Sequence, residues 1–328
     1  MKITSVHGSG GKETSQLIRT LFAKAFQNPV LDRMEDSAVV PGSSRIAMTT
    51  DSFVVTPLFF PGGDIGRLSV CGTVNDLLMS GAVPKYLTCG FILEEGAETE
   101  DLQKIASSMA ETARESGILL VAGDTKVIEG SAGIYINTAG VGFLPEGLEI
   151  SASNCRPGDA VIISGNLGDH HAAIVSARMG ITNTIESDCA PLCEMTAALQ
   201  KSGVRVRAMR DITRGGLATI LNEFAQASRC GIELEEASLP VDPQVAGFCS
   251  LLGLDPLYMG NEGKLAAVVD SQDAEKALAA MKASRYGENA ACIGHVIQAE
   301  EPAVLLKTKL GGTRIITELY GEGLPRIC

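Results

Sequence analysis

The sequence contains no tryptophan, and aromatic residues make up only 4% of its 328 residues. Basic residues are also fewer than acidic ones: the chain has 27 Lys and Arg residues and 39 Asp and Glu residues, which gives a net charge of −12 at pH 7. Nucleic-acid backbones and anionic membrane surfaces bind proteins that present clustered positive charge. The basic residues here are scattered, so we expect neither nucleic acid nor membrane as a partner.

Long apolar runs and paired cysteines are missing as well. The opening sequence MKITSVHGSGG has no apolar signal segment, and no window reaches the ~18 apolar residues of a spanning helix. The nine cysteines are odd in number and include no CxxC pair, which favours a protein of the reducing cytoplasm. Cys189 and Cys193 have no histidine nearby, and we interpret them as small apolar residues of a helix.

Glycine, in contrast, is abundant, with 36 residues against the usual ~7%. Hydrophobic residues make up 45% and charged residues 20%, as in an ordered globular protein. The length predicts two domains of about 150 residues each. The Pro-, Gly- and Ser-containing segment 145–159 is the best candidate for the linker between them.

We therefore predict an N-terminal domain at residues 1–150 and a C-terminal domain at residues 151–320. The remaining residues 321–328 (GEGLPRIC) contain two glycines and a proline and little that is apolar. Such a segment is predicted to be a flexible tail, and it ends at the thiol of Cys328.

Both domains are predicted to mix helices and strands, which makes the fold class α/β (mixed α+β). Apolar residues three and four apart indicate helices, and short apolar runs indicate strands. The expected helices lie at 13–27, 64–81, 101–116, directly after GDHH, and at 190–202, 215–230 and 272–283. The expected strands are SAVV, RIAMTTDSFVV, GILLVAGDTKV, GIYINTAGVGF, AVIISG, KLAAVV, CIGHVIQ, AVLLKT and TRIITEL, the last two joined by a turn at Gly311 and Gly312.

Glycines and carboxylates gather in the first domain in a pattern typical of a phosphate and metal site. Consecutive glycines before a helix let backbone N–H groups converge on an anion. Hard cations such as Mg²⁺ take carboxylate oxygens and bridge them to phosphates, although any one aspartate is more often a turn or N-cap residue. A nearby lysine can neutralise phosphate or exchange a proton. The residues are Gly8, Gly10, Gly11, Asp36, Asp51, Asp76, Asp124 and Lys126.

The second domain carries three further glycine-rich polar motifs, GNLGDHH, RDITRGGL and GNEGKL. Glu262 lies in the last of them, where it is either a functional carboxylate or a solvated turn residue. His170 and His171 are either functional or exposed residues at the start of a helix, and we assign them no metal.

These motifs carry a resemblance that covers nearly the whole chain. HGSGGK, EDSAVVP, TTDSFVVTP, GTVNDLLMSGAVP, AGDTKV, SGNLGDHH, SDCAPL, RDITRGGLA and GNEGKL occur in the order found in the aminoimidazole-ribonucleotide-synthetase-like superfamily of ATP-using enzymes. Within that superfamily the terminal PRIC resembles the HypE family of hydrogenase maturation factors. Ile212 stands where that superfamily is expected to have proline, which affects a turn rather than the chemistry.

The resemblance implies a fold and a set of site residues. It implies an N-terminal α/β module whose sheet pairs across a homodimer, and a C-terminal α/β sandwich. It also implies ATP and Mg²⁺ as cofactors. The residues it assigns to nucleotide and metal are Gly8, Gly10 and Gly11 over the phosphates, Asn75 at the nucleotide, and Asp51, Asp76 and Asp124 at Mg²⁺, with Asp36 as a fourth contributor.

The resemblance also implies a reaction. A HypF-type carbamoyltransferase loads Cys328 with a carbamoyl group, ATP phosphorylates the carbamoyl oxygen, and loss of phosphate leaves a thiocyanate. The cyanide passes to a HypC–HypD type acceptor for the nickel–iron centre of a hydrogenase. Lys126 and Glu262 are the two candidates for the base that takes protons from the carbamoyl nitrogen.

Other functions stay open at the level of the sequence. Selenophosphate synthetase and thiamine-monophosphate kinase are sibling enzymes, but the first uses a Cys or selenocysteine in its glycine-rich loop, whereas the first cysteine here is Cys71. Thiamine-monophosphate kinase has no use for a terminal cysteine. A non-catalytic carrier that binds nucleotide and delivers a group made elsewhere is the alternative outside the enzymes.

Overall fold

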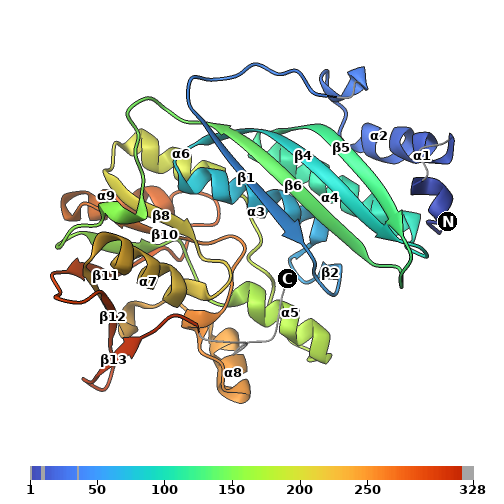
Figure 1. Ribbon diagram of the computed structural model, residues 1–328. Helices are drawn as coiled ribbons and strands as arrows, with labels where there is room; N and C mark the ends of the chain where they lie inside the picture. The colour runs from blue at the N-terminus through green and yellow to red at the C-terminus, as the bar shows by residue number, and fades with distance from the viewer. Residues whose placement is uncertain (1, 9–11, 35–36, 320–328) are drawn as a thin grey trace.

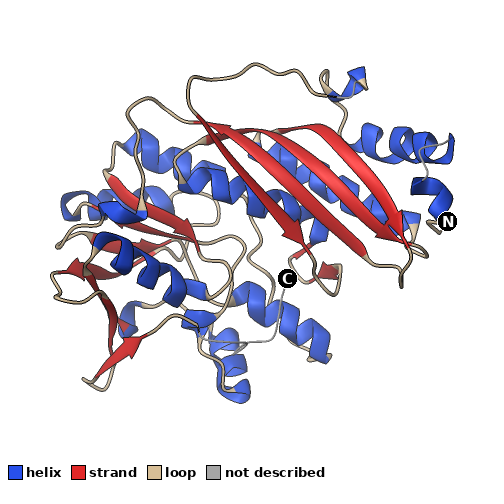
Figure 2. Ribbon diagram, in the orientation of Figure 1, coloured by secondary structure: helices blue, strands red, loops and turns tan. Residues whose placement is uncertain are grey.

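Two β-sheets organise the chain, one in each half. The computed structural model describes residues 2–8, 12–34 and 37–319, and Figures 1 and 2 show the two sheets side by side. The first sheet has the strand order β1–β6–β4–β5 and the second the order β13–β12–β9–β11–β7–β10–β8. A mixed α/β fold is therefore confirmed.

The N-terminal sheet is covered by helices on one face only. Its strands are β1 (Ile46–Phe53), β4 (Val83–Glu94), β5 (Leu119–Ile128) and β6 (Ile134–Phe143), and a small hairpin of β2 (Phe59–Phe60) and β3 (Gly63–Asp64) follows β1. Helices α3 (Ile65–Met79) and α4 (Thr99–Ser116) pack behind this sheet, and no helix of the described ranges covers the other face (Figure 2). The short helices α1 (Lys12–Leu17) and α2 (Ala23–Ala25) lie beside the β5 edge.

Helix α3 lies between the two halves of the molecule. It begins at the N-cap Asp64, whose carboxylate accepts the backbone N–H groups of Gly66 and Arg67, satisfying donors that the first helical turn leaves open. One side of α3 packs on β1 and β6, while the other contacts β8 and α6 of the second half. Thirteen of its fifteen residues are buried, because an element enclosed on two sides has no solvent face.

The C-terminal sheet is a sandwich with helices on both faces. Strand β10 (Leu265–Val269), next to the edge strand β8, is entirely buried, and alternate residues of β7 and β10 face two different cores, as the period of a strand requires. Helix α7 packs on one face, and α5, α6 and α9 pack on the other. The remaining elements are β7 (Ala160–Ile163), α5 (Asp169–Met179), α6 (Cys193–Ser202), β8 (Val206–Asp211), α7 (Gly216–Ser228), β9 (Gly231–Glu235), α8 (Pro243–Leu252), α9 (Ala274–Lys282), β11 (Ala291–Ile297), β12 (Ala303–Lys307) and β13 (Thr313–Ile316).

Most of the expected elements form, with one clear exception. The residues SAVV (37–40) are in no strand, because Pro41 and Gly42 follow at once and no neighbouring strand pairs with them. The hairpin turn at Gly311 and Gly312 is confirmed by the antiparallel pairing of β12 with β13. Strands β4, β8 and β9 and helix α8 were not expected from the sequence.

The segment between β6 and β7 runs from the first sheet to the second. We propose that the domain boundary lies near residue 150, inside this segment. The tail 321–328, with Cys328, lies outside the described residues. None of the helices in the described ranges combines the length and the apolar character needed to cross a membrane.

Candidate functional site

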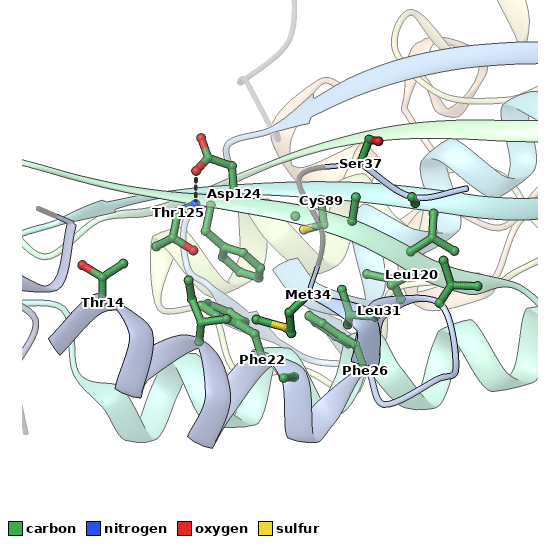
Figure 3. A pocket seen from close by; sticks show the side chains of 18 of the residues that line it. Thr14, Phe22, Phe26, Leu31, Met34, Ser37, Cys89, Leu120, Asp124 and Thr125 are labelled. Atoms are coloured by element: carbon green, nitrogen blue, oxygen red, sulfur yellow. Dashed lines mark hydrogen bonds between the residues drawn. The ribbon is translucent and has the colours of Figure 1, made fainter. Parts of the chain in front are cut away.

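A cavity of about 290 Å³ opens between the N-terminal helices and the β5 edge of the first sheet. Its floor is apolar, and Figure 3 shows the rings of Phe22 and Phe26 with Met34 pointing into it. The ring centroids of Phe22 and Phe91 lie 4.6 Å apart. A cavity of this size and lining suits the flat ring of a small ligand.

Polar groups line the β5 side of the same cavity: Gly8, Asp124, Thr125 and Lys126. Gly8 approaches β5 so closely that a Cβ atom would lie 2.7 Å from the backbone nitrogen of Val127. Only glycine permits this approach of one backbone to another. The other glycines predicted at phosphate, Gly10 and Gly11, lie outside the described residues, as does Asp36.

Asp124 and Lys126 form an ion pair on the outer face of β5. Their side chains are 67% and 65% exposed, and Lys126 Nζ lies 2.9 Å from an Asp124 carboxylate oxygen. The hydrogen bond from Lys126 lowers the pKa of Asp124. Figure 3 shows the Asp124 carboxylate on the opposite side of the strand from the aromatic floor. Because exposed ion pairs contribute little to stability, either side chain can give up this contact to bind a ligand.

Asp51 and Asp76 meet on the inner face of the sheet, where β1 contacts α3. Thr49 donates to Asp76 at 2.7 Å, and Thr73 donates to Asp51 at 3.3 Å. Burial, and then the neighbouring negative charge of Asp76, raise the pKa of Asp51 to about 6. Asp76 lies toward the end of α3, and Asp51 lies within β1.

The structure does not bring Asp124 to the other two aspartates. Strands β1 and β5 are the two edges of the sheet, three strand spacings or roughly 14 Å apart, and the carboxylates lie on opposite faces. Within the described ranges, no three His, Cys, Asp or Glu side chains are arranged to hold a metal ion. Of the three predicted aspartates among the described residues, only Asp51 and Asp76 lie together within one chain.

Two further carboxylates reach this pair from the C-terminal half. Glu262 is only 7% exposed, so the solvated-turn interpretation is wrong. Burial, and then Asp211 and Asp188, raise the pKa of Glu262 well above its ordinary range. Burial, and then Asp76 and Asp51, raise the pKa of Asp211 to about 7. Asp211 was missed, although its place at the end of a strand before a glycine-rich helix start was a usable signal.

His170 and His171 are buried rather than exposed at the start of α5. Burial lowers the pKa of both to about 4, so both imidazoles are neutral near pH 7. His170 Nδ1 lies 2.7 Å from the Ser187 hydroxyl, and its ring packs edge-on against Phe60. Cys193 begins α6, as expected, whereas Cys189 lies in the loop before it.

Asn75 points toward the C-terminal half of the chain. Its side chain is buried, and its carboxamide contacts the C-terminal half of the chain, through Ala190, Leu192 and Glu262.

Comparisons with known proteins agree with this arrangement over the whole chain. The family models for AIR synthase related proteins match residues 34–144 as the N-terminal domain and residues 156–307 as the C-terminal domain. The chain is 47% identical to carbamoyl dehydratase HypE of Rhodobacter capsulatus, over all of this chain and 98% of that protein. It matches the crystal structure of hydrogenase maturation protein HypE in complex with ATP with a TM-score of 0.96 and 44% identity, over 99% of each chain. It matches the structure of a HypE–HypF complex with a TM-score of 0.81 and 47% identity, over 94% of this chain and 100% of that one.

Proposed function

Because the chain belongs to the HypE carbamoyl dehydratases of the AIR synthase related family, we propose that it converts an S-carbamoyl group on Cys328 into a thiocyanate with ATP. The thiocyanate supplies cyanide ligands for nickel–iron hydrogenase maturation. The observation that carries this function is full-length identity to a carbamoyl dehydratase together with a TM-score of 0.96 to an ATP-bound HypE.

The reaction consists of a phosphoryl transfer followed by an elimination. The carbamoyl oxygen is a poor leaving group, so it attacks the γ-phosphorus of ATP and displaces ADP. The nitrogen then gives up its protons as the C–O bond breaks, phosphate leaves, and a carbon–nitrogen triple bond forms. The protein must therefore bind ATP, balance charge on the transferring phosphoryl group and accept protons from nitrogen.

The cavity beside β5 is our candidate for the nucleotide. Its aromatic floor suits the base, and the close approach of Gly8 to β5 supports backbone contacts to the phosphates. Lys126 lies on the polar side of this cavity, where its charge stabilises a transferring phosphoryl group. We keep Gly10, Gly11 and Asp36 as further contributors.

Mg²⁺ fits the chemistry of the Asp51 and Asp76 pair. Two neighbouring carboxylates, of which Asp76 helps to raise the pKa of Asp51, gain from a cation between them. We propose that Asp51 and Asp76 hold Mg²⁺ and that Asp124, whose carboxylate binds Lys126 at 2.9 Å, positions this lysine for the phosphates. The ion, when bound, neutralises phosphate charge.

Glu262 is the better candidate for the base. Lys126 is two-thirds exposed, and its ammonium group is already engaged by Asp124. Glu262 is buried and its pKa is raised, which makes its carboxylate a stronger proton acceptor. We therefore assign proton transfer to Glu262 and phosphate contact to Lys126.

The substitution Asp124→Ala tests the nucleotide site independently of the carrier Cys328. We expect a rise of about tenfold or more in the KM for ATP, since Lys126 loses the partner that positions it and a charge-assisted contact from lysine to phosphate contributes ~1.5–3 kcal/mol. Carbamoylation of Cys328 should be unaffected. Asp101→Ala removes another exposed aspartate paired with a lysine, Lys104 at 3.1 Å, and serves as the control. Equal ATP kinetics in the two variants would remove Asp124 from the nucleotide site.

The uncovered face of the N-terminal sheet supports the proposed homodimer. Its exposed apolar residues include Met48, 69% exposed, with Ile46, Val83, Ile92 and Ile128. Monomeric proteins rarely expose an apolar patch of this kind, and a second copy of the sheet would cover it.

A single charge tests this interface. Met48→Glu is expected to convert a dimer into a monomer in size-exclusion chromatography with light scattering, because it buries a charge in the apolar contact. Leu310, 98% exposed in the turn between β12 and β13, provides the control Leu310→Glu, which should stay dimeric. A dimeric Met48→Glu protein would place the interface elsewhere.

Partners and compartment follow from the same family membership. We propose a HypF-type carbamoyltransferase as the donor, supported by the solved HypE–HypF complex, and a HypC–HypD type complex as the acceptor. The eight cysteines among the described residues are free, which agrees with the proposed cytoplasmic location.

Mass spectrometry of the peptide that contains Cys328 tests the function. After incubation with a HypF-type carbamoyltransferase, carbamoyl phosphate and ATP, the carbamoylated peptide should lose one water in an ATP-dependent step. If the carbamoyl adduct persists and this protein does not hydrolyse ATP, the protein is a carrier and not a dehydratase.

A further inference from the structure

Asn75 connects helix α3 of the N-terminal half to the turn that carries Glu262. Its side chain is 2% exposed. Its carboxamide nitrogen donates to the carbonyl oxygen of Ala190 at 3.0 Å and to that of Glu262 at 3.4 Å. Its carboxamide oxygen accepts the backbone N–H of Leu192 at 2.9 Å. Both donor hydrogens and the acceptor of this side chain are therefore engaged by protein.

The backbone of Glu262 is held on both sides by the same neighbouring segment. Its N–H donates to a carboxylate oxygen of Asp188 at 3.0 Å, and its carbonyl oxygen also accepts the N–H of Ala190 at 3.3 Å. At Gly263, a Cβ atom would lie 1.9 Å from the carbonyl oxygen of Asp188. The turn and the segment 188–192 thus pack backbone against backbone, and Asn75 is the side chain from the other half of the molecule that joins them.

The neighbour of Asn75 in the chain faces the other way. Asp76 accepts a hydrogen bond from Thr49 of β1, within the pair assigned to Mg²⁺, whereas Asn75 contacts the turn of the proposed base. Two consecutive residues of one helix therefore fix the distance between the metal-binding carboxylates and the proton acceptor. Catalytic groups need such a fixed relation, because a displacement of 1 Å costs about 10²-fold in rate.

We propose that Asn75 is a positioning residue for the dehydration: it holds the turn of Glu262 against α3 and does not contact the nucleotide. This inference rests on the proposed function, since it gives a role to the base of that reaction. It replaces the nucleotide contact that the sequence predicted for Asn75.

The substitution Asn75→Ala tests the proposal in the full-length dimer, with the Cys328 carbamoyl group loaded beforehand. We expect the single-turnover rate of thiocyanate formation to fall by about 10²-fold, with the dissociation constant for ATP within about twofold of wild type. The rate effect should vanish in a Glu262→Gln background, because a residue that acts through Glu262 has nothing left to position.

Asn222→Ala is the matched control. Asn222 is also buried and donates to two carbonyl oxygens, of Ala218 at 2.8 Å and of Ile316 at 3.0 Å, but it joins α7 to β13 within the C-terminal half. This variant should lose thermal stability and keep the wild-type dehydration rate. Asn75→Ser repeats the test with a polar side chain if Asn75→Ala fails to fold.

Three results would overturn the inference. Weaker ATP binding with an unchanged rate at saturating ATP would return Asn75 to the nucleotide. A further 10²-fold loss on top of Glu262→Gln would show that Asn75 acts independently of Glu262. A wild-type rate in both Asn75 variants would give the residue no part in the reaction, whereas an inactive wild-type protein would count against the proposed function itself.

Discussion

The variant Glu262→Gln is expected to slow thiocyanate formation while it raises the thermal unfolding temperature. The rate should fall by about 10²- to 10⁴-fold, the range that a positioned general base contributes. Stability should rise, because burial and the neighbouring Asp211 and Asp188 disfavour the Glu262 carboxylate, and a neutral amide of the same shape removes that repulsion. Loss of function with gain of stability is the signature of a strained functional group.

The measurement follows the Cys328 peptide by mass spectrometry and the unfolding by calorimetry. Carbamoylation and ATP affinity should match those of the wild type, so the carbamoyl adduct accumulates. Glu235→Gln, at an exposed position of β9, removes the same charge outside the site and should change neither rate nor adduct. If Glu262→Gln dehydrates the carbamoyl group at the wild-type rate, Glu262 is not the base, and the role of proton acceptor passes to Lys126, the other candidate.

The fixed position of Glu262 depends on how the two halves pack. Arg67 of α3 donates from Nε to the carbonyl oxygen of Cys189 at 2.8 Å and forms an ion pair with Glu115 at 3.0 Å. Tyr286, from the segment after α9, donates to the same Glu115 carboxylate. These contacts flank the segment 188–192 that holds the Glu262 turn. They give the interface a polar network with one preferred arrangement, as a site divided between two domains requires.

Local patterns in the sequence predicted most elements but missed the central strand β4. Its residues include Pro84 and Gly90, both of which argue against a strand. The structure accommodates Pro84 through an irregularity in the pairing with β6, between Pro84 and Tyr86. SAVV (37–40) shows the opposite error. It was predicted to be a strand from its composition, but it forms none because no neighbouring strand pairs with it. Strand formation is decided by the neighbouring strand as well as by the residues.

The site was predictable as a set of motifs but not as an arrangement. Asp51, Asp76 and Asp124 were expected at one metal, yet the strand order places β1 and β5 at opposite edges. The order of strands in a sheet is a property of the tertiary fold, which motif spacing does not contain. The burial of Glu262 and the partial burial of Asp211 likewise arise only when the second half of the chain packs against α3, so a one-dimensional pattern could not indicate them.

The second large effect is a change in how stability depends on pH. The pKa of Asp211 rises from an ordinary 3.8 to about 7, because the group is buried and faces Asp76 and Asp51. The folded state therefore keeps the proton of Asp211 after the unfolded chain has lost it. Stability from this group is fully present below the unfolded pKa and is lost as the pH rises through about 7. Ionisation in the folded state costs on the order of 4 kcal/mol.

Asp211→Asn should remove that loss, because an amide does not ionise at any pH in the range. The wild-type protein is expected to become less stable between pH 5 and pH 8, whereas the variant should change less and be the more stable of the two at pH 8. A smaller pH dependence of stability remains in the variant, because Asp51, with its pKa raised to about 6, is still present. Urea unfolding with EDTA present measures this in the absence of divalent cations. Asp101→Asn, exposed on α4, should follow the wild type. If the free energy of unfolding depends equally on pH in the wild type and in Asp211→Asn, Asp211 is ionised in the folded protein. The group of interacting carboxylates at the domain interface would then contain Asp51 and Asp76 but not Asp211.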